Sequence, residues 1–122
     1  MVSRIRQWTL DVRDVDVMGR FWSAALGYRA EYGDDGCAKL YPPGDDPAPE
    51  LTVWLQAGAD PKAGKNRNHP DLRADGDVDA EVERLISLGA RHGDVGQKDT
   101  DPFVVLADPE GNEFCLLRNK PR

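Results

Sequence analysis

Two stretches of this sequence share one layout: "QWTLDVRDVDVMGRFWSAALG", residues 7–27, and "HPDLRADGDVDAEVERLISLG", residues 69–89. They align without a gap, but only three of the aligned positions are identical. In each, an alternating polar and apolar segment comes first, followed by aspartates, an apolar pattern with three- and four-residue spacing, and a glycine. Alternation predicts a strand and the wider spacing predicts a helix, so each stretch predicts a strand followed by a helix.

The boundaries of the first copy carry recognisable signals. Residues 5–12 alternate, which indicates a strand with one face on a core. Asp14 or Asp16 can begin the helix, because a short carboxylate accepts hydrogen bonds from the free N–H groups of a first turn. Gly27 can end it. The corresponding residues of the second copy are Asp77 or Asp79 at the start and Gly89 at the end.

Further short strands are predicted after each helix. In the first half they are "AKLY" (38–41) and "ELTVWLQ" (50–56). In the second half "FVVLA" (103–107) and "EFCLL" (113–117) flank "DPEGN" (108–112), which suits a tight turn because Pro fixes φ and Gly tolerates positive φ. The strand over 50–56 is expected to bury Leu51, Val53 and Leu55.

This order defines the predicted organisation: one domain of 122 residues built from two similar modules. The first module covers about 1–57, a linker covers about 58–67, and the second module covers about 68–122. The linker is rich in turn formers and charge, so it is expected to cross the surface. Its basic residues are interpreted as solvated rather than as a phosphate-binding track: Lys62, Lys65 and Arg67.

Composition excludes several classes of function. The net charge of −6 argues against nucleic-acid binding, which needs clustered basic residues. No stretch approaches the ~20 apolar residues of a membrane span, and no signal peptide is recognisable. Cys37 and Cys115 are too far apart for a Cys-x-x-Cys pair, so neither a disulfide scaffold nor a thiolate zinc cluster is expected. A reduced, cytoplasmic protein is the simplest interpretation.

The strand faces that point away from each module's core are mostly polar. If two half-sheets curve towards each other, these side chains line a shared cleft, and such a pocket is the default binding site. A merely hydrated sheet face is the alternative. The residues on these faces are Gln7, Thr9, Asp11, Thr52, Trp54, Gln56, His69, Asp71, Arg73, Glu113, Cys115 and Leu117.

Three segments resemble the vicinal oxygen chelate superfamily, within it the glyoxalase-like and bleomycin-resistance-like domains: "FWSAALGY" (21–28), "GKNRNHPDLRADGDVDAEVERLISLGA" (64–90) and "VVLADPEGNEFCLL" (104–117). The resemblance implies an α+β fold of two βαβββ modules that form a curved mixed sheet around a cleft. It also implies a homodimer in many members, and often a divalent metal. Known activities include lactoylglutathione formation, extradiol ring cleavage, epimerisation and fosfomycin addition, while metal-free members sequester antibiotics.

In metal-using members the resemblance implies ligands on the first and last strands of each module. Carried over by position, the opening ligands fall on Gln7 and His69, but the closing ones fall on Trp54, which cannot coordinate, and on Cys115. Glu113 lies two residues before Cys115 on the same strand face. The predicted metal ligands are therefore Gln7, His69 and Glu113.

This set is incomplete for a hard cation such as Mg²⁺, which prefers octahedral oxygen ligands. A softer ion such as Zn²⁺ accepts Cys and His, so Cys115 and His69 could hold one. Because the residues depart from the family pattern, we expect that the protein binds no metal. The alternative is that it binds a divalent ion of Zn, Ni, Co or Mn.

Three functions compete. An enzyme would use His69 and Glu113 as catalytic residues, with the metal polarising the oxygens of a substrate; lyase, isomerase and dioxygenase chemistry all occur in the superfamily. A binding protein would hold an antibiotic or other hydrophobic molecule against the flat wall of Trp54. A partner domain would bind no ligand. The residues favour a glyoxalase-like domain that binds a small molecule and lacks the full metal set.

Overall fold

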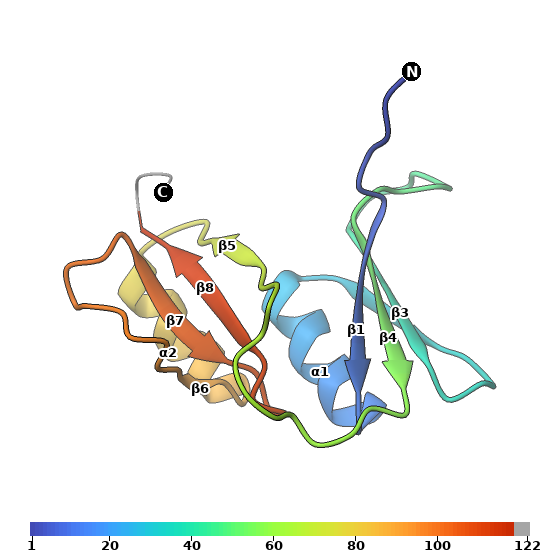
Figure 1. The fold of residues 1–122 in the computed structure, drawn as a ribbon. Helices are drawn as coiled ribbons and strands as arrows, with labels where there is room; N and C mark the ends of the chain where they lie inside the picture. The colour runs from blue at the N-terminus through green and yellow to red at the C-terminus, as the bar shows by residue number, and fades with distance from the viewer. Residues whose placement is uncertain (119–122) are drawn as a thin grey trace. The chain divides into compact units, whose positions relative to one another are not determined.

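The structure is a computed structural model, and it describes residues 1–118. The chain forms two compact units, Met1–Pro61 and Lys62–Arg122, each a four-stranded mixed sheet with one helix (Figure 1). The predicted α+β class and the two repeated modules are confirmed. Within residues 1–118, neither helix is long and apolar enough to cross a membrane.

The first unit consists of five elements. They are β1 (Gln7–Val12), α1 (Val15–Leu26), β2 (Arg29–Tyr32), β3 (Ala38–Tyr41) and β4 (Thr52–Ala57). The strand order in the sheet is β1-β4-β3-β2. β1 runs parallel to β4, whereas β2–β3 and β3–β4 are antiparallel.

Local chemistry explains the strand–helix start of this unit. The Asp14 carboxylate accepts from Val17 N at 3.1 Å and so caps α1, and Gly27 ends the helix in the left-handed region at φ 69°. Phe21 and Trp22 of α1 are buried, and their rings meet edge to face at a centroid distance of 5.1 Å. The apolar face of α1 therefore provides the core against its own sheet.

The second unit repeats the arrangement. Its elements are β5 (Asp71–Arg73), α2 (Val78–Leu88), β6 (Arg91–His92), β7 (Phe103–Ala107) and β8 (Glu113–Leu117). The strand order is β5-β8-β7-β6, with β5 parallel to β8 and the other pairs antiparallel. Asp77 caps α2 by accepting from Ala80 N at 2.9 Å. Leu85, Leu106 and Phe114 are completely buried in this unit.

The structure differs from the expectations at three places. The resemblance implies three strands after each helix, but no residue range was predicted for β2 or β6, because they expose nearly every side chain and so lack an apolar alternation. Leu51 was expected on the buried face with Val53 and Leu55, and this expectation is wrong. Leu51 precedes β4, has φ 57°, and is 56% exposed. The Tyr28 hydroxyl donates a hydrogen bond to the carbonyl oxygen of Leu51 at 3.1 Å. This bond ties the segment before β4 to the end of α1.

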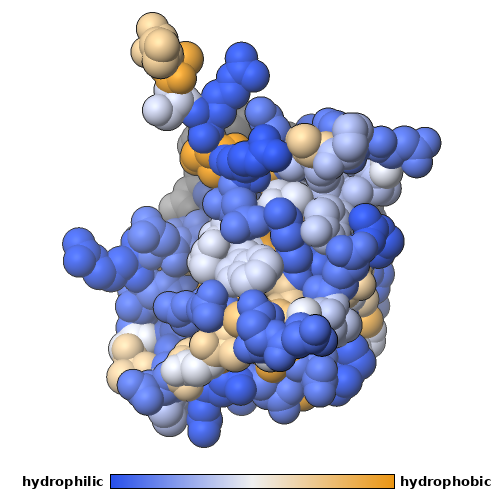
Figure 2. All heavy atoms as spheres, turned by 90° about the vertical axis from the view of Figure 1, so that its right-hand side faces the viewer, coloured by the Kyte–Doolittle hydropathy of each residue, from blue (hydrophilic) through white to orange (hydrophobic). Residues whose placement is uncertain are grey.

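The face shown in Figure 2 is mainly hydrophilic, in keeping with the acidic composition. Hydrophobic residues stand out at the top of this view, where the N-terminal segment projects. The exposed apolar residues of that segment are Met1, Val2 and Ile5.

Candidate functional site

The second unit contains a cavity of about 260 Å³. One wall is apolar and comes from β7 and β8, whose Phe103, Val105 and Cys115 line it. Val95 and Gly96, in the loop between β6 and β7, also line it. The other lining side chains are polar and come mainly from that loop and from the segment before β5. They are Lys65, Asn66, His69, Gln97 and Asp101, together with Glu113 at the start of β8.

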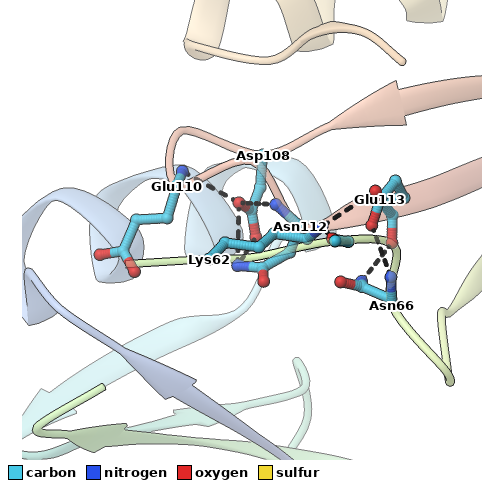
Figure 3. Close-up of polar contacts among 7 residues, drawn as sticks. Lys62, Asn66, Asp108, Glu110, Asn112 and Glu113 are labelled. Carbon is cyan, nitrogen blue, oxygen red and sulfur yellow. Dashed lines mark hydrogen bonds and ion pairs between the residues drawn. The ribbon is translucent and has the colours of Figure 1, made fainter. Parts of the chain in front are cut away.

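The tight turn before β8 is organised by a buried aspartate. Asp108 is 0% exposed, and its Oδ1 accepts from the backbone N–H groups of Glu110 and Asn112 at 3.0 Å and from Asn112 Nδ2 at 3.1 Å (Figure 3). Gly111 takes φ 88°, where a glycine is favoured. The predicted turn over 108–112 is thus present, and its carboxylate fixes where β8 starts.

Glu113 is the first residue of β8, and partners occupy both of its carboxylate oxygens. Lys62 Nζ donates to Oε1 at 2.9 Å and Asn66 N donates to Oε2 at 3.1 Å (Figure 3). Asn66 Nδ2 also donates to the Glu113 carbonyl oxygen at 3.1 Å. The Lys62 and Glu113 side chains are only 18% and 16% exposed. These bonds hold residues 62–66 against the end of the cavity.

Burial opposes the ionisation of Glu113, but the hydrogen bonds from Lys62 and Asn66 favour the charged form more strongly. The pKa of Glu113 is therefore lowered. The expectation that Lys62 is merely solvated linker charge is wrong, because its ammonium is bound to Glu113. Glu113 as a metal ligand or proton acceptor stays a prediction.

A second group of polar atoms meets where β5 pairs with β8. Asp71 lies opposite Cys115 in the parallel register, and Cys115 N donates to the Pro70 carbonyl oxygen at 3.0 Å. His69 Nε2 lies 3.4 Å from Asp71 Oδ1. One ligand atom each of His69, Asp71 and Cys115 lies within 4.8 Å of the other two. An imidazole nitrogen, a carboxylate oxygen and a sulfur are donors of the kind that zinc accepts.

The remaining predicted residues of the second unit lie further along its strands. Arg73 ends β5, where it is exposed and lies opposite Leu117 in register. Neither Arg73 nor Leu117 lines the 260 Å³ cavity. The structure thus brings together His69, Asp71, Cys115 and Glu113 at the start of the β5–β8 pair.

The predicted residues of the first unit lie on paired strands of its own sheet. The parallel register of β1 and β4 places Gln7 opposite Thr52, Thr9 opposite Trp54, and Asp11 opposite Gln56. The Thr52 hydroxyl, buried, donates to Gln7 Oε1 at 2.9 Å, and Trp54 Nε1 donates to Gln56 Oε1 at 2.8 Å. Trp54 also lines a hollow of about 440 Å³ together with aromatic residues of β2 and β3, Tyr32 and Tyr41.

These contacts test the four-ligand metal set that the resemblance implies. An indole carries an N–H donor and no lone pair for a metal, and Trp54 already donates that hydrogen to Gln56. The Gln7 oxygen accepts from Thr52 and both Glu113 oxygens accept hydrogen bonds, and each oxygen keeps a further lone pair. The misfit therefore lies at Trp54, which leaves one of the four positions without a ligand. The residues present do not fit that set.

Most of the residues that line the cavity were not predicted from the sequence, and neither were two residues that organise its polar end, Lys62 and Asp108. The unpredicted lining residues are Lys65, Asn66, Val95, Gly96, Gln97, Asp101, Phe103 and Val105. The Asp-Pro-Glu-Gly order carried a usable signal for Asp108, because an aspartate before such a turn accepts from the backbone two residues on. The sequence carries no comparable signal for Lys62 or Asn66, because their partner Glu113 is 51 and 47 residues away along the chain.

Comparison with known proteins gives a consistent result for sequence and fold. A sequence model of the glyoxalase-like domain family matches residues 7–117. The comparison with curated proteins returned no match. The fosfomycin resistance protein FosX from Mesorhizobium loti is structurally similar, with TM-score 0.74 and 20% identity over 98% of this chain and 94% of that one.

Two further solved structures are similar. FosX from Listeria monocytogenes, complexed with Mn(II) and sulfate, has TM-score 0.74 and 18% identity over 98% of this chain and 93% of that one. A glyoxalase/bleomycin resistance protein/dioxygenase family enzyme from Burkholderia phytofirmans has TM-score 0.69 and 17% identity, over 95% and 98% of the two chains. At these identities the likeness shows a shared fold.

Proposed function

Since the chain belongs to the family of glyoxalase-like domains, we propose that it is a small-molecule-binding domain whose ligand occupies the cavity of the second unit. The observation that carries the proposal is the lining of this cavity: an apolar wall with Phe103 faces several polar side chains. A concave apolar surface with a few polar groups that fix orientation is the usual form of a ligand site.

The dimensions and the lining limit the ligand. A volume of about 260 Å³ lies just below the range of roughly 300–1,000 Å³ for drug-sized ligands, so the ligand is small. Lys65 is exposed at the rim and offers a positive charge, and Asn66 and Gln97 offer amide groups. The carboxylates of Asp101 and Glu113 line the same cavity. We therefore expect a compact molecule with a short apolar part, whose carboxylate or phosphonate binds Lys65 and the amides and whose hydroxyl or amino group donates to the carboxylates.

Metal-assisted enzyme chemistry is the second candidate function. It is favoured by the contact of His69 Nε2 with Asp71 Oδ1, because a carboxylate beside an imidazole fixes the orientation of the ring. In this account His69 takes or returns a proton of the bound molecule. A sequestering protein would bind the same molecule and leave it unchanged.

Ligand-observed NMR with small carboxylates and phosphonates, fosfomycin included, tests the proposal. Phe103→Ala removes the aromatic wall, and we expect it to weaken binding about tenfold, which corresponds to roughly 1.4 kcal/mol. His92→Ala is the matched control, because His92 is an exposed residue of β6 outside this cavity. Equal binding by wild type and Phe103→Ala, or no binding by any compound of the class, contradicts the proposal.

Incubating any bound compound with the protein and analysing the products separates the two candidate functions. Conversion that is lost in His69→Ala identifies an enzyme, whereas an unchanged compound identifies a binding protein.

A further inference from the structure

We propose that Gln97 is a positioning residue that limits the size of the ligand in the second unit. It lies in the loop between β6 and β7, residues 93–102, and this loop forms a large part of the cavity lining. The loop residues that line the cavity are Val95, Gly96, Gln97 and Asp101. The inference rests on the proposed function, because the limit applies to the molecule bound in this cavity.

The loop is held together by polar contacts rather than by apolar packing. Apart from the ring of Pro102, Val95 is its only aliphatic side chain. Gln97 Oε1 accepts from Val95 N at 2.8 Å, and Gln97 Nε2 donates to the Gly93 carbonyl oxygen at 2.7 Å. Because one end of the amide accepts and the other donates, these two bonds fix its orientation. A single side chain therefore joins the first and last residues of the segment 93–97.

The base of this segment is fixed against β7. Gly93 N donates to the Val105 carbonyl oxygen at 3.0 Å. The strand is so close that a Cβ at Gly93 would lie 3.0 Å from Val105 Cγ1 and 3.4 Å from the Leu106 carbonyl oxygen. Since Gly93 is held in this way, the two bonds of Gln97 set the position of Val95 relative to β7.

A second hollow adjoins the cavity at this loop. Its volume is about 280 Å³, and it shares Gln97, Phe103 and Val105 with the cavity. β6 pairs with Leu106 and Ala107, so on this side the loop, rather than a paired strand, adjoins the first residues of β7. The loop is therefore the wall between the two hollows, and a displaced loop would join them.

The position of this wall determines how long an apolar group the cavity can hold. With Val95 in place, the apolar part of the ligand lies against Phe103 in the 260 Å³ cavity. With the wall displaced, a longer group reaches Val104, which lines the second hollow but not the cavity. Each methylene group that leaves water for such a surface improves affinity about fourfold. The bonds of Gln97 therefore select against long ligands.

Binding of straight-chain alkylphosphonates, from methylphosphonate to octylphosphonate, measures this limit. Ligand-observed NMR gives their affinities for the full-length wild type and for Gln97→Met, which keeps the length of the side chain and removes both loop bonds. For the wild type we expect affinity to rise over the short members and to fall for the long ones. In Gln97→Met the ratio of the affinity for hexylphosphonate to that for ethylphosphonate should rise about tenfold, the gain from one to two further buried methylene groups. Gln97 also offers an amide hydrogen to the ligand, and its loss weakens all members alike, so the ratio is the readout.

Two further variants keep the test specific. Val95→Ala trims the wall but keeps the backbone N–H that donates to Gln97, and it should raise the same ratio. Thr100→Ala changes an exposed residue of the same loop that lines neither hollow, and it should leave the ratio unchanged. Far-ultraviolet circular dichroism checks that each variant is folded. An unchanged ratio in folded Gln97→Met, or a wild-type affinity that keeps rising up to octylphosphonate, overturns the proposal.

Amide hydrogen exchange distinguishes the failure of this inference from the failure of the proposed function. The Val95 N–H should exchange faster in Gln97→Met than in the wild type, whether or not a ligand binds, and an unchanged rate contradicts the role of Gln97. Faster exchange without phosphonate binding by any of these proteins supports the positioning of the loop and contradicts the ligand pocket. Phosphonate binding with an unchanged ratio supports the pocket and contradicts the size limit.

Discussion

The contact that holds residues 62–66 against β8 can be measured as a free energy of unfolding. Lys62 Nζ and Asn66 N donate to different oxygens of Glu113, at 2.9 and 3.1 Å. Because the Lys62 and Glu113 side chains are 18% and 16% exposed, water screens the pair only in part. Hydrogen bonds to charged groups contribute about 1.5–3 kcal/mol. Glu113→Gln keeps a neutral acceptor and removes the charge, so we expect it to cost about 2 kcal/mol at neutral pH.

This cost should depend on pH in a defined direction. The pKa of Glu113 is lowered in the folded protein because the bonds from Lys62 and Asn66 outweigh the effect of burial. A carboxyl whose folded pKa is lowered stabilises the fold fully above its unfolded pKa, ~4.3, and loses this contribution as the pH falls through the lower folded value. The stability difference between wild type and Glu113→Gln should therefore shrink as the pH falls below about 4.3.

Urea unfolding of four proteins measures the effect: wild type, Glu113→Gln, Lys62→Met and the double variant. We expect a coupling energy of about 1–2 kcal/mol between the two sites, because each substitution removes the same ion pair. Glu83→Gln, an exposed glutamate of α2, is the matched control and should change stability by less than about 0.5 kcal/mol. If the two substitutions have additive effects, or if the stability difference persists unchanged in acid, the Lys62–Glu113 ion pair does not stabilise the fold in this way.

Three further predictions concern the turn, a helix cap and assembly. Asp108→Ala leaves the N–H groups of Glu110 and Asn112 without their acceptor, and we expect it to cost about 3 kcal/mol in urea unfolding; a loss under 1 kcal/mol contradicts this. Asp77→Ala removes the cap of α2 and should cost about 1 kcal/mol, whereas an unchanged unfolding midpoint would contradict the cap's role. The homodimer implied by the family resemblance predicts twice the 13.5 kDa of one chain in light scattering, and a monomer mass at every concentration argues against it.

The strand–helix starts of both units were predictable because their signals are local. Asp14 and Asp77 accept from backbone N–H groups three residues on, and Gly27 and Gly89 take positive φ where their helices end. Nothing distant in the chain is needed for these contacts. The short strands β2 and β6 were not predictable, because they are exposed and are defined by their hydrogen-bonded neighbours rather than by their own pattern.

Some residues of the candidate site were likewise predictable from the local sequence pattern, whereas others depend on contacts with distant parts of the chain. Strand alternation was enough to place His69, Asp71 and Cys115 on related faces of the second module. The partners of Glu113 could not be found in this way, because Lys62 lies in a charged linker and approaches only when β8 is formed. The burial of Asp108 was equally out of reach, since an exposed turn carries the same sequence pattern.

Amide chemical-shift mapping by NMR can show whether a small molecule binds in the cavity of the second unit. Isotope-labelled protein would be titrated with fosfomycin and with any small anion that binds in the ligand screen. We expect the largest shift changes to cluster around the cavity: residues 65–69, residues 95–103 and the first residues of β8. Shift changes confined to the first unit, or none with any compound of the class, would contradict the assignment of the ligand pocket to the second unit.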